Sequence, residues 1–531
     1  MTLPAPPVRF NFATQVLARA AAQPDAPAFR DDTGALTYGA LADRIRRFST
    51  ALAALDIRRE ERVFLLAHDG LDWPVAFLGA LHAGVVPVAV NTMLTVDDYA
   101  YMLAHSRARA AIVSPALAAT VAGAMARASH DIGHVIVCGT PATSGTAAAT
   151  AGLPGRLDFA SLVSEAKPAP APADTLADDM AFWLYSSGST GRPKAAVHTH
   201  ANLHWTHVTY AQNVLALTPQ DTVFSAAKLF FAYGLGNALT FPLSAGASVV
   251  LMGERPTPQA VWKRLVEQKP TVFFGVPTLY AAMLAAADKP ARADLAMRVC
   301  VSAGEALPKE LGERYTAQYG AEILDGIGST EMLHIFLSNR GGTVRYGSTG
   351  TPVEGYDVEL RGEDGATVAD GEIGDLYVRG PSAALFYWAD RDRSRATFEG
   401  AWTKSGDKYS RSADGYYTYA GRADDMLKVS GQYVSPFEVE AALMAHPSVL
   451  EAAVIGTPDA DNLTRARAYV VVRAGVDAND ALADALKAFV KDRLAPFKYP
   501  RQIEFIGELP KTATGKIQRF RLRERAAAAA R

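Results

Sequence analysis

The sequence has little of several features that would restrict the class of a protein. It contains two cysteines in 531 residues, Cys138 and Cys300, and each lies in an apolar stretch. We therefore expect two buried thiols in a reducing compartment rather than a disulfide. The start of the chain, MTLPAPPVRFNF, lacks a basic segment followed by an apolar one, so it does not predict a secretion signal. A cytoplasmic location is expected.

Long apolar runs and an excess of one charge are also missing. The longest apolar run, residues 272–287, is too short to cross a membrane and contains Gly275 and Pro277. Lys and Arg number 53 against 55 Asp and Glu, which gives a net charge of −2. This balance gives no electrostatic basis for binding nucleic acid. We expect neither a membrane-spanning segment nor a nucleic-acid partner.

What the chain does contain is a regular alternation of two kinds of segment. From about Leu36 to Leu251, Ala- and Leu-rich stretches alternate with short β-branched or apolar segments, namely RVFLLA, AAIVSP, HVIVCG, TVFSAA and SVVLMG. Further segments of the second kind follow at TVFFGV, RVCVSAG and AEILDG. This alternation predicts an α/β protein with mostly parallel sheets flanked by helices.

Two changes in composition divide the chain. Residues 139–178 are rich in Ala, Pro, Thr, Ser and Gly, which predicts a solvated connector. After Tyr419 the sequence becomes polar and glycine-punctuated, and we place a domain boundary there. Beyond it, apolar residues at helical spacing over 482–494 predict an amphipathic helix in a compact C-terminal unit.

A segment rich in glycine and hydroxyl side chains follows the strand-like run MAFWLY. It reads YSSGSTGRPK over residues 185–194. Glycines let backbone N–H groups turn inward, hydroxyls add donors and the lysine adds a positive charge, so this composition predicts an anion-binding loop. The spacing differs from the Walker motif, and a flexible Ser/Gly linker is the alternative interpretation. The residues expected to bind phosphate are Ser186, Ser187, Gly188, Ser189, Thr190, Gly191 and Lys194.

The longer segment YSSGSTGRPKAAVHTH resembles the signature loop of the adenylate-forming superfamily. That superfamily includes acyl-CoA synthetases, luciferases and peptide-synthetase adenylation domains. The resemblance implies that ATP activates a carboxylic acid as an acyl-AMP and that the acyl group then passes to a thiol, here that of coenzyme A. It also implies further motifs downstream, and candidates for them occur in order.

The first downstream motif, DGIGSTE at residues 325–331, resembles the second nucleotide-binding segment of the superfamily. The resemblance assigns Thr330 to the AMP phosphate and Glu331 to Mg²⁺. That cation usually takes one or two protein carboxylates beside phosphate and water. An ordinary turn is the alternative for a glycine-rich strand end. Other residues implied to bind the nucleotide or its ribose are Ala303, Gly304, Glu305, Asp325, Gly326, Ile327, Asp407 and Arg422.

A second motif, PKTATGKIQR at residues 510–519, resembles the C-terminal loop that carries a mobile catalytic lysine in the superfamily, here Lys516. In the implied reaction a carboxylate must approach the α-phosphate of ATP, so two anions meet. Lys516 and Mg²⁺ are therefore expected to be the main electrostatic catalysts. The acid is already ionised at neutral pH, so no general base is required.

The resemblance also implies how the chain divides. It predicts an N-terminal adenylation domain over 1–420, a hinge over 421–425 with Asp424 at the pivot, and a small mobile α+β domain over 426–531. Lys428 and Gly431 fall in the segment that the superfamily swings in for thioester formation with coenzyme A. An ordinary polar linker is the alternative for these residues.

The segment KLFFAYGLGN at residues 228–237 lies where the superfamily places the wall of its acyl pocket. Three aromatic residues within it predict a small, flat cavity, although aromatic runs also occur in ordinary cores. Over nearly its whole length the chain resembles benzoate-CoA ligases within the superfamily. The implied pocket residues are Phe230, Ala232, Tyr233, Gly234, His334 and Ile335.

Other functions remain open at this point. An aryl-acid adenylation enzyme that loads a carrier protein shares the nucleotide motifs, as does a synthetase for another small or medium-chain acid. The presence of Lys194, Glu331, Asp407 and Lys516 counts against a non-enzymatic adenylate-binding regulator. The expected partners are the acid, ATP and coenzyme A, and a homodimer is left open. A metal site is a further alternative, based on four histidines: His198, His200, His204 and His207. No Glu follows His200 as in the zinc-protease pattern, which counts against this alternative.

Overall fold

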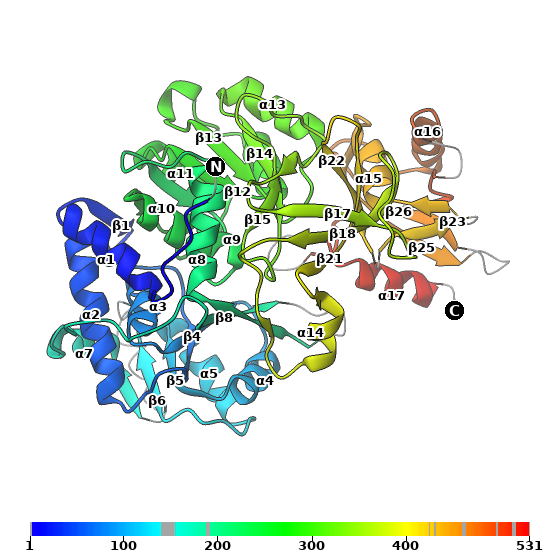
Figure 1. Ribbon diagram of the computed structural model, residues 1–531. Coiled ribbons are helices and arrows are strands. Elements are labelled where there is room, and N and C mark those ends of the chain that lie inside the picture. Colours follow the sequence, from blue (N-terminus) through cyan, green and yellow to red (C-terminus); the bar gives the residue numbers. More distant parts are fainter. Residues whose placement is uncertain are drawn as a thin grey trace.

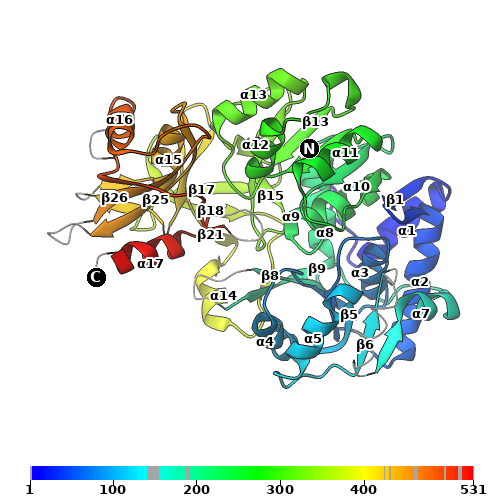
Figure 2. The same ribbon diagram turned by 180° about the vertical axis from the view of Figure 1, so that it is seen from behind.

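The computed structural model describes residues 3–139, 153, 155–186, 192–423, 425–429, 432–458, 464–494, 498–511 and 517–529. Within these residues, sheets of eight, nine and five strands precede residue 423, and two smaller sheets follow. Figures 1 and 2 show the later elements beside the five-stranded sheet and away from strands β5 and β6 of the eight-stranded sheet.

The eight-stranded sheet has the order β19-β9-β8-β4-β3-β5-β6-β7. Strands β3 to β8 pair in parallel, whereas β8 pairs antiparallel with β9, and β9 with β19. The bounds are β3 Arg62–Leu66, β4 Val86–Ala89, β5 Ala108–Val113, β6 His134–Val137, β7 Arg156–Asp158, β8 Met180–Ser186, β9 Lys194–Thr199 and β19 Phe386–Tyr387.

Helices cover both faces of this sheet. Alternate residues of β3 face opposite sides, so Val63 and Leu65 join one core cluster and Phe64 and Leu66 join another. The first cluster includes residues of α2 (Tyr38–Ala54) and α3 (Asp72–His82), and the second includes residues of α4 (Val96–Ser106) and α5 (Ala118–Met125). Continuous apolar strands such as RVFLL form because both of their faces are buried.

The nine-stranded sheet has the order β16-β15-β14-β13-β12-β10-β11-β1-β2. Its central strands, from β1 to β14 in that order, pair in parallel. The bounds are β1 Pro27–Asp31, β2 Gly34–Thr37, β10 Thr222–Ser225, β11 Ser248–Val250, β12 Val272–Gly275, β13 Val299–Ser302, β14 Ile323–Gly328, β15 Ile335–Ser338 and β16 Thr351–Pro352. The sequence prediction of parallel sheets flanked by helices is confirmed for both large sheets.

The five-stranded sheet is antiparallel, with β22 paired to β21 beside the path β17-β18-β21-β20. Its bounds are β17 Asp357–Arg361, β18 Ile373–Arg379, β20 Phe398–Glu399, β21 Trp402–Arg411 and β22 Tyr417–Arg422. The alternation of helical and strand-like segments does not extend to this region, because adjacent antiparallel strands can be joined by short turns.

The elements after residue 426 form a smaller α+β unit. Its main core cluster includes residues of β25, β26, α15 and α16, and α17 packs in a second cluster. The predicted amphipathic helix is α16, which buries Leu486 and Val490. The bounds are β23 Leu427–Val429, β24 Gln432–Val434, α15 Pro436–Met444, β25 Val449–Pro458, β26 Thr464–Val472, α16 Asp480–Lys491, β27 Gln502–Phe505 and α17 Arg519–Ala529.

Most of the remaining helices lie between strands of the two large sheets, whereas α1 precedes β1 and α14 lies between β19 and β20. Their bounds are α1 Phe12–Ala22, α7 Phe159–Glu165, α8 His200–Thr206, α9 Ala232–Leu235, α10 Phe241–Ala245, α11 Pro258–Glu267, α12 Pro277–Ala285, α13 Lys309–Tyr319 and α14 Arg391–Thr397. Two π-helical turns follow α8 and α9, at η2 (His207–Gln212) and η3 (Gly236–Thr240).

One prediction about composition is partly wrong. Residues 156–165 of the expected connector form β7 and α7, and Phe159 and Val163 are buried against α2. Two apolar side chains one turn apart are enough to hold a short helix on a core, although the surrounding composition is that of a loop.

Both cysteines are free and buried, as predicted. Burial raises the pKa of each thiol to about 12. Among the described residues, no helix has both the length and the apolar character needed to cross a membrane.

Candidate functional site

The two strands that contain the ends of the 185–194 segment run antiparallel, so the ends of the segment lie side by side. Ser186 is the last residue of β8, Lys194 is the first of β9, and the two are partners in the register of the pair. The predicted phosphate-binding residues between them, Ser187, Gly188, Ser189, Thr190 and Gly191, lie outside the described residues.

Lys194 meets Glu331 and a tyrosine that the sequence analysis did not select. Its Nζ lies 3.0 Å from Glu331 Oε1 and donates to Tyr387 Oη at 2.6 Å. The Tyr387 hydroxyl in turn donates to Glu331 Oε1 at 2.7 Å. Strand β19 brings Tyr387 here by pairing with β9, with Tyr387 opposite Ala196. The three side chains, Lys194, Tyr387 and Glu331, form a closed triangle that we call the Lys–Tyr–Glu triad.

The triad keeps a buried carboxylate ionised. Burial would raise the pKa of Glu331, but the Lys194 ammonium and the hydrogen bond from Tyr387 lower it below its usual value. The Lys194 and Glu331 side chains are only 18% and 13% exposed, so their attraction is weakly screened by water. Glu331 therefore carries its negative charge at neutral pH.

The donor chemistry at Glu331 fits Mg²⁺ shared with phosphates. Within the described ranges no cluster of three or more His, Cys, Asp or Glu could hold a metal, so this part of the chain builds no all-protein cage. A single ionised carboxylate beside a phosphate-binding segment is the protein contribution that Mg²⁺ commonly uses. The Glu331 carboxylate therefore fits a Mg²⁺ ion that is also bound by phosphate.

His198 fixes the segment that carries Thr330 and Glu331. Its Nε2–H donates to the Thr330 carbonyl at 2.8 Å, and its ring stacks on Phe182 with centroids 5.1 Å apart. Burial lowers the pKa of His198 to about 4, so the ring is neutral. This histidine connects β9 of one large sheet to the end of β14 in the other.

Two other histidines of the alternative metal group, His200 and His204, have separate partners. His200 Nδ1 accepts from the backbone N–H of Phe12 at 3.2 Å. His204 lies 3.0 Å from Gln15 Oε1 through Nδ1 and 2.9 Å from the Pro4 carbonyl through Nε2. These contacts bind the N-terminal residues to α8 and give the histidines a structural role.

Four deeply buried histidines predict that the protein loses stability in mild acid. Burial lowers the pKa to about 4 for His198 and His200 and to about 3 for His207 and His334. Each folded pKa lies below the unfolded value of 6.5, so the stabilisation is complete above pH 6.5 and declines as pH falls toward 4. Between pH 7.5 and 5.5 we expect a loss of about 1 kcal/mol per histidine, measured by urea unfolding.

His200→Asn provides the control for this prediction. Asparagine keeps an acceptor for Phe12 N but does not titrate, so the variant should lose about 1 kcal/mol less over the same pH interval. An unfolding free energy that is the same at pH 7.5 and 5.5 would contradict the assignment.

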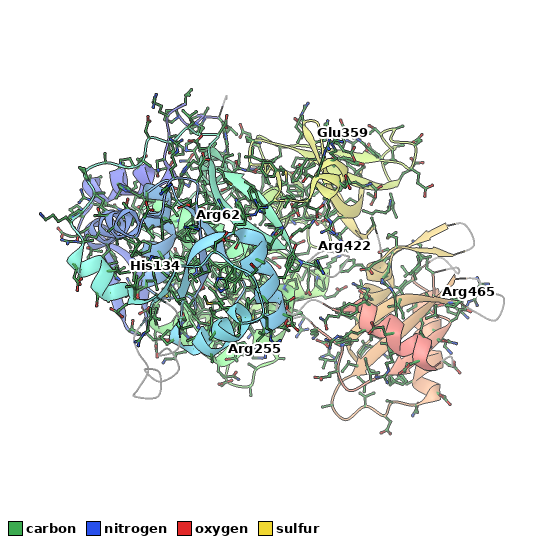
Figure 3. All side chains as sticks on the ribbon, turned by 90° about the horizontal axis from the view of Figure 1, so that it is seen from below. Arg62, His134, Arg255, Glu359, Arg422 and Arg465 are labelled. Carbon is green, nitrogen blue, oxygen red and sulfur yellow. The ribbon has the colours of Figure 1, made fainter. Side chains whose placement is uncertain are left out.

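The two predicted ribose contacts form an ion pair. Arg422 Nη1 lies 3.1 Å from Asp407 Oδ1, and the two residues face each other across β21 and β22. Gly406 has φ +77°, and a Cβ there would lie 2.8 Å from Arg422 Nη2. A glycine is therefore needed for the arginine to approach. Figure 3 shows Arg422 between the five-stranded sheet and the C-terminal elements.

The predicted adenine-facing residues follow two neighbouring parallel strands. Ala303, Gly304 and Glu305 come directly after β13, and Asp325 pairs with Ser302 across β13 and β14. Burial raises the pKa of Asp325, and its Oδ1 and the Ser302 Oγ are buried without a hydrogen-bond partner. Carboxyl ends of parallel strands are common ligand sites, and unsatisfied polar atoms there leave bonding capacity for a ligand. Gly326 and Ile327 continue β14.

His334 is the centre of the predicted acyl wall. Its ring centroid lies 4.4 Å from Phe241, 5.2 Å from Tyr210 and 5.7 Å from Tyr233. Its Nε2 lies 2.9 Å from Asn237 Oδ1, while its Nδ1 and Asn237 Nδ2 are buried without a partner. Because the ring is neutral, it adds polar bonding capacity to an aromatic enclosure without adding charge.

The other predicted pocket residues divide between two cores. Phe230 and Ala232 pack in the cluster of α2 and α3, whereas Tyr233 and Ile335 pack in the cluster that contains Phe241. Gly234 cannot carry a side chain, because a Cβ would lie 2.0 Å from the Lys228 carbonyl oxygen. Gly236 was missed: a Cβ there would lie 2.4 Å from His334 Cδ2, so the glycine makes room for the imidazole.

The predicted hinge touches the C-terminal helix. Asp425 lies 3.6 Å from Arg519 and also pairs with Arg523, and Arg519 donates to both oxygens of Glu440 at 2.7 Å. Asp424, Gly431 and Lys516 lie outside the described residues, and Lys428 is described only as part of the backbone of β23.

Comparison with known proteins matches two family models along the chain. "AMP-binding enzyme" matches residues 16–388, and "AMP-binding enzyme C-terminal domain" matches residues 438–516.

Curated relatives match over nearly their full length. The chain is 51% identical to a benzoate-CoA ligase of Thauera aromatica, over 97% of this chain and 96% of the relative. It is 46% identical to a 4-hydroxybenzoate-CoA/benzoate-CoA ligase of Rhodopseudomonas palustris, over 94% and 90%.

Solved structures share the fold. A benzoate CoA ligase from Burkholderia xenovorans is 57% identical, with a TM-score of 0.89 over 97% of this chain and 100% of that one. An anthranilate CoA ligase in complex with anthranoyl-AMP is 38% identical, with a TM-score of 0.92 over 99% of each chain. The chain therefore belongs to the AMP-binding enzyme family, the adenylate-forming superfamily whose signature loop it carries.

Proposed function

We propose that this protein is an AMP-forming benzoate-CoA ligase. The relatives that match nearly the whole chain at 51% and 46% identity carry this activity in their names. The single structural observation that supports it best is the Lys–Tyr–Glu triad, which places an ionised carboxylate and an ammonium beside the predicted phosphate-binding segment.

The reaction has two half-reactions. In the first, an oxygen of the benzoate carboxylate attacks the α-phosphorus of ATP, the bond to the β-phosphate oxygen breaks, and pyrophosphate leaves. In the second, the sulfur of coenzyme A attacks the acyl carbon, the bond to the AMP oxygen breaks, and the thiol proton passes to solvent. Benzoyl-CoA and AMP are the products.

The residues of the site divide the work of the first step. Lys194 and Tyr387 hold Glu331 ionised and fixed, and Thr330 is positioned by His198 beside the phosphate. Asp407 accepts from the ribose hydroxyls, and Arg422 orients that carboxylate. Mg²⁺, held by Glu331, supplies positive charge to the phosphoryl oxygens when it is bound. Lys516 adds a second cation from the C-terminal loop.

The aromatic surroundings of His334 support a flat acid. Phe241, Tyr210 and Tyr233 enclose a neutral imidazole, so the wall offers ring faces and edges but no charge. An aryl ring packs favourably against such a wall, and its carboxylate is left to face the nucleotide.

The proposed domain organisation is 1–420, a hinge at 421–425 with Asp424 as pivot, and a mobile unit at 426–531. Support comes from the ends of the two family matches, at residue 388 and residue 438, on either side of the proposed hinge. Lys428 and Gly431 are proposed to serve the thioester-forming step. We also propose a cytoplasmic location, since two buried free thiols suit a reducing compartment.

A panel of acids tests the proposal. Benzoate with ATP, Mg²⁺ and coenzyme A should give AMP and benzoyl-CoA in equal amounts, and at a higher kcat/KM than hexanoate or octanoate. Pyrophosphate release that is accompanied by no benzoyl-CoA when coenzyme A is present would favour a carrier-protein-loading enzyme. A higher kcat/KM for an alkyl acid would overturn the aryl assignment.

A further inference from the structure

Helix α4 (Val96–Ser106) contacts residues near both ends of the 185–194 segment, although it ends about 80 residues before the segment in the sequence. None of its residues has a role in the chemistry proposed above. Two of them, Tyr101 and His105, are one helical turn apart and stack with ring centroids 5.1 Å apart and planes inclined by 21°.

His105 holds Tyr185, the first residue of the segment. Its Nδ1 lies 2.8 Å from the hydroxyl of Tyr185, in β8. Burial raises the pKa of Tyr185 and lowers that of His105, so both groups are neutral and share a hydrogen bond. The end of β8 is thereby fixed to α4.

Tyr101 holds Arg192, near the end of the segment. The Arg192 guanidinium carbon lies 5.6 Å from the centroid of the Tyr101 ring, within the range of a cation–π contact. Arg192 stands two residues before Lys194, the first member of the Lys–Tyr–Glu triad. One stacked pair on α4 therefore contacts both ends of the segment.

The same helix also contacts the strand that carries Tyr387. The indole Nε1–H of Trp388 donates to the His105 carbonyl at 3.1 Å. Trp388 packs on Trp183 with centroids 4.6 Å apart, and Arg62 and Arg107 each lie 5.6 Å from its ring. Figure 3 shows Arg62 on the same body of the molecule as the large sheets. The contacts of α4 therefore reach Tyr185 in β8, Arg192 two residues before β9, and Trp388 directly after β19.

Helix α4 is itself well anchored. A reciprocal capping box between Thr95 and Asp98 fixes its start. Tyr99, Met102 and Leu103 are buried in the core cluster below it. A helix held at its cap and along its buried face can act as a rigid support for the residues that it contacts.

We propose that Tyr101 and His105 are positioning residues for the ATP-binding segment. They act through Arg192 and Tyr185 and touch neither substrate. Holding Tyr185 and Arg192 in place fixes the described residues on either side of the predicted phosphate-binding residues before ATP binds, so the pair lowers the KM for ATP. This inference rests on the proposed function, because it assigns the 185–194 segment to ATP.

Kinetics of Tyr101 variants provide the test. Tyr101→Leu removes the ring face below Arg192 and beside His105, and we expect the KM for ATP to rise about three- to tenfold. The KM for benzoate, and the rate of thioester formation from supplied benzoyl-AMP, should stay within about twofold, since neither uses the segment. Tyr101→Phe keeps the ring and should restore the wild-type KM for ATP.

Two further variants separate positioning from general stability. Tyr99→Phe, on the same helix, loses hydroxyl contacts to Leu94 and Asn91. It should lower the melting temperature without changing the KM for ATP. In an Arg192→Met background, Tyr101→Leu should raise that KM by less than it does in the wild type, because residues that act through one contact are not additive.

The outcomes distinguish the two proposals. A wild-type protein that forms no benzoyl-CoA would refute the proposed function. An active wild type with an unchanged KM for ATP in Tyr101→Leu, or equal rises in the KM of both ATP and benzoate, would overturn the positioning role. Should Tyr101→Leu fail to fold, Tyr101→Met gives the same comparison with a side chain of similar volume.

Discussion

Replacing Lys516 with alanine is expected to stop formation of the acyl-adenylate and to leave thioester formation from supplied benzoyl-AMP nearly unchanged. The first step brings a carboxylate to a phosphate, so a cation at the developing charge has its largest effect there. A unit charge at about 4 Å and an effective dielectric near 20 contributes at most about 4 kcal/mol, which corresponds to roughly a thousandfold in rate.

Single-turnover assays of the two half-reactions measure this division directly. Benzoate with labelled ATP reports adenylate formation, and benzoyl-AMP with coenzyme A reports thioester formation. Lys511→Ala is the matched control, because Lys511 lies in the same motif but pairs with Glu451 on β25. Equal losses in both half-reactions of Lys516→Ala would show that the lysine is not specific to adenylation.

Replacing Glu331 with glutamine should lower the rate of adenylate formation by about a hundred- to a thousandfold. The change removes the carboxylate proposed for Mg²⁺ and leaves the Lys194 ammonium without its buried partner. Removing one member of a buried pair commonly costs about 3–5 kcal/mol. The rate should be measured against free Mg²⁺, where the variant should need a higher concentration for half-maximal activity, and unfolding in urea reports the loss of stability.

Two variants provide the comparison for Glu331→Gln. Tyr387→Phe keeps the carboxylate, its charge and the ring below Lys194. It removes two hydrogen bonds with charged groups, one from Lys194 and one to Glu331, so a loss of at least about tenfold is expected. Glu359→Gln changes an acid that pairs with Arg361 outside the site and should have no effect on adenylation. Wild-type rates for Glu331→Gln at saturating Mg²⁺ would contradict the role of the triad.

The local pattern of apolar residues was sufficient to predict much of the fold. Segments such as RVFLLA and TVFFGV become β3 and β12, because a strand buried on both faces must be continuously apolar. Lys194 and Glu331 were each selected from their own motifs. Their contact at 3.0 Å was not predictable, since it depends on how β9 and β14 of two different sheets meet.

Tyr387 shows most clearly what a single sequence hides. It lies in the run ALFYWAD, which has the composition of an ordinary core strand, and nothing local indicates a partner about 190 residues away. Only the pairing of β19 with β9 brings its hydroxyl to Lys194. His198 is a second example: sequence reasoning assigned it no role beyond a disfavoured metal alternative, whereas burial and its hydrogen bond to the Thr330 carbonyl give it a structural role.

The most direct test of the central claim follows oxygen atoms. Benzoate labelled with ¹⁸O in both carboxylate oxygens should give AMP that carries one labelled oxygen, benzoyl-CoA that keeps the other, and unlabelled pyrophosphate. That pattern requires the carboxylate to attack the α-phosphorus. Label in pyrophosphate or inorganic phosphate, with none in AMP, would contradict the account.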